Sequence, residues 1–195
     1  TEFESSEIDI NFYNLYADYD WDINSDWSSR LGVAYSYNDY TEETFIEPRL
    51  TLRYQLNDEY RLKLAAGQHH QWFRQYKYLS DTFGAPDLKL SQSNHYVLGI
   101  EYLGESDWAW RLETYYKDMD ELVVSNPDLQ VTSLGGVPNG SQDSNYLNEG
   151  VGDAYGVELL INKAISNDWY GWLSIAYSKT ERVNQITGEE FSYQY

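Results

Sequence analysis

Two adjacent histidines, His69 and His70, have the side chains in this sequence whose chemistry is easiest to name. Imidazole nitrogens bind metal ions and hydrogen-bond to polar ligands near neutral pH. The pair ends an alternating run, where neighbouring side chains point to opposite faces, so a regular strand cannot bring both rings to one metal ion. We therefore expect no metal here. Contact with a ligand is a hypothesis for four residues: His69, Trp72, Arg74 and Tyr76. A solvated loop is the alternative interpretation.

A second candidate is an acidic stretch from Asp118 to Asn162 that contains no Lys or Arg. Its acidic residues are Asp118, Asp120, Glu121, Asp128, Asp143, Glu149, Asp153 and Glu158. Carboxylates are ligands for Ca²⁺, but the stretch lacks the ordered spacing of a calcium loop. A solvated acidic loop is the preferred interpretation, and we expect no cofactor.

Enzyme chemistry and nucleic-acid binding are both disfavoured. The sequence has no cysteine, no G-x-S-x-G and no glycine-rich phosphate loop opening a helix. Acidic pairs such as Asp120 and Glu121 are too common here to indicate a glycosidase. The net charge of −19 opposes phosphate binding, which needs Lys and Arg. We expect neither an enzyme nor a nucleic-acid partner.

The elements that would hold these residues are strands. In the stretch Gly99–Lys117, apolar and charged residues alternate on both sides of a short polar turn. A period of two places successive side chains on opposite faces, which indicates a β-hairpin. Similar hairpins recur along the chain, each with a short acidic turn followed by an aromatic residue. The four turns are Asn24–Trp27, Asn57–Tyr60, Glu105–Trp108 and Asn167–Tyr170.

Eight strands of roughly 8 to 12 residues follow from these turns. The runs are Tyr13–Ile23, Trp27–Tyr37, Arg49–Leu56, Tyr60–Gln71, His95–Leu103, Trp108–Lys117, Tyr155–Ile165 and Tyr170–Lys179. The connections at the other end are longer and polar: Asn38–Glu47, Trp72–Asn94, Asp118–Ala154 and Thr180–Glu190. We predict an all-β, antiparallel, up-and-down sheet. Any ligand specificity is expected in Trp72–Asn94 and Asp118–Ala154, because binding residues concentrate on loops.

The apolar face is expected to contact lipid. Its candidate members are Leu31, Val33, Leu50, Leu52, Leu62 and Leu64. Tryptophans gather beside the short turns, as in the interface belt of a membrane barrel: Trp21, Trp27, Trp108, Trp110 and Trp169. Short periplasmic turns and long extracellular loops fit a transmembrane β-barrel. The opposite face carries charges that we expect to pair across strands. The alternative is a small complete β-barrel or a soluble β-protein that serves adhesion or carbohydrate binding.

Strand polarity favours a segment of a larger barrel. With periplasmic short turns, the first strand would start outside the cell, whereas complete bacterial barrels normally begin and end in the periplasm. Glu189–Tyr195 reads as part of a ninth strand. We expect residues 1–195 to form one partial barrel domain.

Three stretches resemble the barrels of TonB-dependent receptors. Ser80–Tyr102 is similar to the family's "G-x-P-x-L-x-x-x-x-S-x-x-Y-x-x-G-x-E" stretch, matching it at Gly84, Pro86, Leu88, Ser93, Tyr96, Gly99 and Glu101. Gly152–Arg182 resembles a later "G-x-x-x-G-V-E" hairpin, at Gly152, Gly156, Val157 and Glu158. Tyr115–Val123 also looks like the family.

The resemblance implies a 22-stranded outer-membrane barrel, plugged by an N-terminal domain, that takes up a scarce nutrient with energy from TonB. The sequence departs from this pattern in lacking the plug, the TonB box and the final strands. The implied partners are outer-membrane lipid and lipopolysaccharide, the TonB complex through the missing plug, and a small-molecule or oligomeric nutrient. For the acidic stretch, bridging of lipopolysaccharide phosphates through divalent ions is the alternative to the preferred solvated loop.

Overall fold

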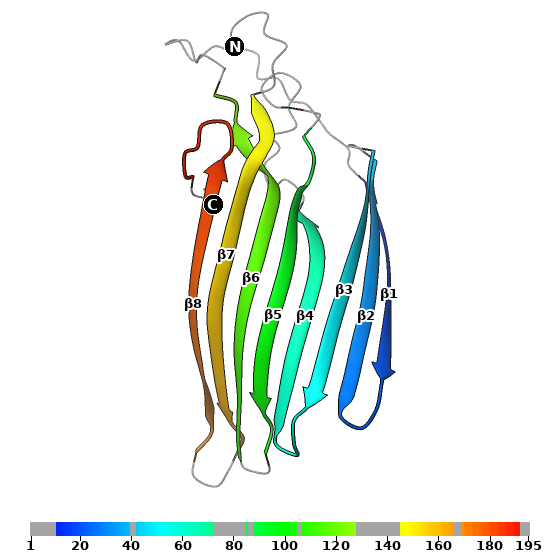
Figure 1. Ribbon diagram of the computed structural model, residues 1–195, viewed down its shortest axis with the longest axis vertical. Helices are drawn as coiled ribbons and strands as arrows, with labels where there is room; N and C mark the ends of the chain where they lie inside the picture. The colour runs from blue at the N-terminus through cyan, green and yellow to red at the C-terminus, as the bar shows by residue number, and fades with distance from the viewer. Residues whose placement is uncertain are drawn as a thin grey trace, which may run out of the picture.

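The described part of the protein forms one antiparallel sheet of eight strands, each paired with its neighbours in chain order (Figure 1). The strands are β1 (Phe12–Asp22), β2 (Trp27–Asn38), β3 (Glu43–Gln55), β4 (Tyr60–Gln71), β5 (Ser91–Tyr102), β6 (Trp108–Ser125), β7 (Tyr146–Lys163) and β8 (Gly171–Asn184). This computed structural model describes residues 11–39, 42–71, 85, 88–104, 107–127, 145–165 and 169–191. Among these residues, no helix is long and apolar enough to cross a membrane. The predicted up-and-down fold is confirmed.

The strands are longer than predicted at the end that carries the long connections. β6 and β7 have 18 residues each, so much of the expected Asp118–Ala154 connection is strand. The register shifts after Met119 and again after Leu122, and Glu121 between them has a left-handed φ of 54°. Alternation fails at such a bulge because one strand gains an unpaired residue. The prediction rested on alternation, so it stopped too early.

The connection after β8 is also shorter than expected. β8 continues to Asn184, whose side chain accepts hydrogen bonds from the amides of Ile186 and Thr187 and so closes a tight turn. Gly188 completes this turn at a φ of 70°. The amide of Phe191 then donates to Arg182 on β8 at 2.9 Å. Glu190 and Phe191 thus pair with the end of β8, where the ninth strand was expected to start. Residues 192–195 lie outside the described part.

Two of the short turns at the opposite end share one hydrogen-bonding pattern. The Asn24 side-chain oxygen accepts from the amides of Asp26 and Trp27, both at 2.9 Å. Asn57 does the same for Glu59 and Tyr60, at 3.0 and 2.9 Å. An asparagine side chain that accepts from the backbone two residues later mimics a backbone turn. The predicted turns around residues 105–106 and 166–168 lie outside the described residues.

The two faces of the sheet differ in chemistry as predicted. On one face, large apolar side chains stay exposed, including Leu50 at 43%, Leu64 at 50% and Leu98 at 51%. No second layer covers this face in the described part of the chain. Among the described residues, few apolar ones are buried: Ala85, Leu88, Leu90, Met119, Val124 and Ala154. An antiparallel sheet of a soluble protein would bury its apolar face against a core.

Ion pairs between strands occupy the other face, which confirms the predicted cross-strand pairing. Arg30 binds Asp20 on the neighbouring strand through two hydrogen bonds of 2.7 and 2.9 Å. Lys63 on β4 reaches Glu113 on β6 at 2.8 Å, although β5 runs between them. The register explains this, because Lys63 pairs with Gly99 and Gly99 pairs with Glu113. Glycine at the middle position leaves room for the two side chains to meet above the backbone.

Substitution of Gly99 by leucine is expected to break this arrangement. A Cβ atom at position 99 would lie 3.0 Å from Cγ of Glu113, and a longer side chain would fill the space of the Lys63–Glu113 ion pair. We expect Gly99→Leu to reduce the free energy of unfolding by about 1–3 kcal/mol, measured by urea unfolding. Gly171→Leu is the control, because a Cβ there meets nothing within 4 Å. Equal losses in both variants would contradict the role of Gly99.

Candidate functional site: a histidine-rich cluster on the charged face

All three histidines of the chain lie near the long-loop end of β4 and β5. The rings of His69 and His95 are 4.5 Å apart, centroid to centroid. Gly67 makes this contact possible, since it pairs with His95 and leaves open the space that His69 covers. A Cβ on Gly67 would lie 3.3 Å from both Nε2 of His69 and Cγ of Arg49. The imidazole of His69 therefore lies over the backbone of Gly67, beside Arg49.

His70 belongs to a different set of contacts, centred on Glu47 of β3. The Glu47 carboxylate accepts a 2.6 Å hydrogen bond from the His70 amide, approaches Nδ1 of the same residue at 3.3 Å and binds Arg49 at 3.0 Å. The ring of His70 packs 4.4 Å from the ring of Phe45. The two adjacent histidines thus contact different neighbours.

Glu47 replaces backbone pairing where β3 and β4 separate. The β3–β4 register ends at Arg49 and Gly67, and the next residue on β3, Pro48, has no amide hydrogen. Beyond this point β4 diverges from β3 in Figure 1. Glu47, only 9% exposed, spans the gap through its side chain. A buried carboxylate is stable here because each of its oxygens accepts a hydrogen bond.

The cluster combines two cations with several neutral donors. Arg49 pairs in register with Gly67, Gly67 with His95, and His95 with Lys117, so these residues form one row across β3 to β6. The Glu47 side chain, which binds Arg49, already accepts three hydrogen bonds. The row therefore offers N–H donors and positive charge toward the charged side of the sheet. Such a surface suits hydrogen bonding to an anionic or polar ligand.

The structure describes only one of the four residues predicted to contact a ligand. It places His69 in this cluster, whereas Trp72, Arg74 and Tyr76 lie outside the described residues. Sequence reasoning missed His95 and Lys117, although the register of the two alternating runs would have placed His95 opposite Gly67. In the described part of the chain, no group of three or more His, Cys, Asp or Glu side chains could hold a metal ion.

Side-chain hydrogen bonds hold the strand ends from which the long connections start. Asn148 on β7 accepts from the amide of Lys89 at 2.8 Å and donates to the Lys89 carbonyl at 2.9 Å. It also donates to the carbonyl of Glu121 in the β6 bulge. At the β1–β2 edge of the sheet, the Asp39 carboxylate accepts hydrogen bonds from the backbone amide and the side-chain amide of Asn11. These hydrogen bonds lower the pKa of Asp39. The segments that follow start from defined positions.

The predicted belt residues lie at the short-turn end, and four of the five make aromatic contacts there. The ring of Trp27 is 4.5 Å from Tyr54, Trp110 is 6.2 Å from Tyr102, and Trp108 is 5.4 Å from Trp169. Trp21 is 48% exposed at the end of β1. The predicted lipid-facing leucines and Val33 share the apolar face with these rings, as the strand register requires.

Neutralising Glu47 should loosen the junction of β3 and β4. Hydrogen bonds to charged groups contribute about 1.5–3 kcal/mol, so Glu47→Gln should speed amide hydrogen exchange at His70 by about tenfold or more. Glu59→Gln is the matched control, because Glu59 lies in a short turn where its backbone amide donates to Asn57 and its backbone carbonyl accepts from Leu103. Unchanged exchange at His70 in the Glu47 variant would show that this carboxylate is not what joins the strands.

Three solved structures with a similar fold are each much longer than this chain. The siderophore receptor PirA from Pseudomonas aeruginosa has a TM-score of 0.70 at 14% identity, with 89% of this chain and 36% of PirA covered. The ferric enterobactin receptor PfeA from the same organism scores 0.71 at 16% identity, covering 92% and 28%. The alcaligin receptor FauA from Bordetella pertussis scores 0.67 at 17% identity, covering 94% and 32%. The chain thus spans about a third of each.

The sequence itself carries the family assignment. No curated protein matches it. The family described as "TonB dependent receptor-like, beta-barrel" matches residues 2–194, almost the whole chain. This match disfavours the alternative of a soluble sugar-binding β-protein, and it concerns a family of receptors and transporters that reside in the bacterial outer membrane rather than a family of enzymes. The chain belongs to the TonB-dependent receptor β-barrel family.

Proposed function

We propose that this chain forms part of the barrel wall and the bases of the extracellular loops of a receptor that takes up a scarce nutrient. The observation that carries the proposal is the family match over residues 2–194. The sheet supports it physically, because one face is apolar and exposed while the other carries paired charges. A barrel in a bilayer needs this division between lipid and lumen.

The apolar face is the proposed lipid contact, and the aromatic rings near the short turns are the proposed periplasmic belt. Amphipathic rings favour the headgroup level of a bilayer. The belt and the apolar rows lie on the same face of the sheet, as the pairing of Trp27 with Tyr54 and of Leu52 with Leu64 requires. The long connections then lie on the extracellular side, where lipopolysaccharide is the neighbouring lipid.

A charge on the apolar face should destabilise the barrel in the membrane. Leu52 pairs with Ser29 and Leu64 near the middle of the face, so Leu52→Arg is expected to cost about 2–4 kcal/mol in the complete receptor. Thr51→Arg places the same side chain on the charged face and is the matched control. Urea unfolding in lipid vesicles measures the difference. A larger loss from the control would reverse the assignment of the faces.

Ligand contact is proposed for His69 together with Trp72, Arg74 and Tyr76. His69 lies in the cluster with Arg49, and the three other residues directly follow β4. The imidazole and the guanidinium supply hydrogen-bond donors, and the aromatic rings supply flat stacking surfaces. The transported nutrient is a small molecule or an oligomer. The TonB complex is the proposed source of energy and would act through a plug domain in the complete receptor.

Exchange of the connections is the direct test of where specificity resides. The segments 72–90 and 126–145 are replaced by those of a receptor with a different known ligand, while all eight strands are kept. Because binding residues concentrate on loops held by a rigid scaffold, uptake of labelled ligand should follow the new segments. The matched control exchanges only the turn 57–59 at the other end. Uptake specificity that remains with the strands would refute the proposed role of the connections.

A further inference from the structure

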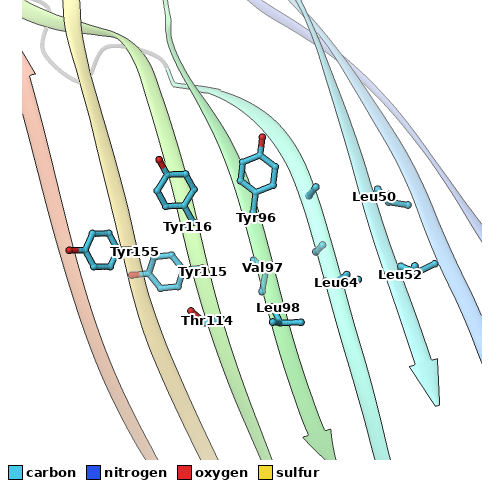
Figure 2. Close-up of a pocket in the computed structure, with 12 residues that line it drawn as sticks. Leu50, Leu52, Leu64, Tyr96, Val97, Leu98, Thr114, Tyr115, Tyr116 and Tyr155 are labelled. Atoms are coloured by element: carbon cyan, nitrogen blue, oxygen red, sulfur yellow. The ribbon is translucent and has the colours of Figure 1, made fainter. Parts of the chain in front are cut away.

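The apolar face is not uniformly filled. A hollow of about 550 Å³ lies across β3 to β7 (Figure 2). Leu50, Leu52, Leu64 and Leu98 form one side, and the rings of Tyr96, Tyr116 and Tyr155 form the other. Figure 2 shows the rings of Tyr96 and Tyr116 next to each other, with centroids 6.4 Å apart.

Two small side chains create the hollow. Ala66 stands between Leu50 and Tyr96 in one register row, and Thr114 follows Leu98 in the next row. The hydroxyl of Thr114 donates to the carbonyl of Gly156 at 3.0 Å, so its hydrogen-bonding capacity is used by the sheet. Most of the surface that remains is hydrocarbon. A hollow of this kind on an apolar face suits an apolar occupant.

The position of the hollow identifies the leaflet. The next row toward the long connections, on the same face, is wholly polar: Gln68, Asn94, Asp118 and Asp153. Consecutive rows on one face are two residues apart, or about 7 Å along a strand. Tyr116 marks the boundary, since its hydroxyl hydrogen-bonds to Asp153. The hollow therefore lies just below the extracellular edge of the apolar surface.

We propose that this hollow binds one acyl chain of a lipopolysaccharide molecule from the outer leaflet. An acyl chain has the chemistry of the lining, and lipopolysaccharide is the lipid of the leaflet that this position meets. Lys179, which pairs in register with Tyr155 at the edge of the hollow, is a cation available to the head of the same lipid, although it also pairs with Glu181 at 2.6 Å. The site is separate from the charged face, and its assignment to the outer leaflet rests on the proposed lipid contact and orientation of the barrel wall.

Filling the hollow tests the proposal. The complete receptor is extracted from outer membranes in mild detergent, and retained lipid is identified by native mass spectrometry. We expect the unmodified receptor to keep one lipopolysaccharide, and Ala66→Phe and Thr114→Phe to reduce this retention at least tenfold. Ala17→Phe is the matched control, because Ala17 lies on the same face on β1, outside the hollow. Heat-dependent migration on a gel verifies that each barrel is folded.

Each result decides the proposal. Loss of lipopolysaccharide from either filled variant that folds, with retention in the Ala17 variant, supports it. Retention of a phospholipid in place of lipopolysaccharide overturns the proposed source, and equal retention in all variants overturns the site. If both filled variants fail to fold, the unmodified receptor is incubated with phosphatidylethanolamine vesicles, and complete exchange of its lipopolysaccharide refutes specific binding. Ligand uptake is measured separately, so failure here leaves the proposed function testable.

Discussion

The pairing of every backbone group with a neighbouring strand is the constraint on which the rest of this structure depends. No water is available inside a bilayer to bond an unpaired amide or carbonyl, so a membrane sheet must satisfy its backbone internally. Consecutive antiparallel pairing does this for the inner strands β2 to β7, each of which has a neighbour on both sides, and it leaves only the side chains to adapt the two faces. Where the pairing between β3 and β4 ends, the Glu47 side chain takes over as acceptor, with 2.6 Å to the His70 amide.

Glycines let the charged face neutralise itself across more than one strand. Gly99 separates Lys63 from Glu113, and the ion pair closes above it at 2.8 Å. Gly156 has a related role, because a Cβ there would lie 2.5 Å from the carbonyl of Tyr177 and 2.8 Å from the Tyr115 hydroxyl. Both glycines belong to the stretches that resemble the receptor family. Glycine is needed at both positions because side chains of the neighbouring strand pack directly over the backbone there.

Alternation explains how much of this fold could be predicted. Between the short turns and the middle of the sheet, one face is apolar and the other charged, so a period of two placed all eight strands. Near the long connections both faces become polar, as Asp118 and Asp153 show, and the sequence carries no signal there. The histidine cluster was only partly predictable, because His69 stood out in the sequence whereas the roles of His95 and Lys117 depend on register through Gly67.

Small residues have opposite consequences on the two faces. On the charged face, a gap over glycine is closed by the protein's own long side chains, as where His69 covers Gly67. On the apolar face, the neighbours of Ala66 are leucine and tyrosine, which have few rotatable bonds and stand away from the sheet. Those side chains cannot fold over the gap, so the space stays open until a molecule from outside occupies it. In a membrane the surrounding solvent is lipid, and a fixed hollow in the barrel wall can select among lipids by shape.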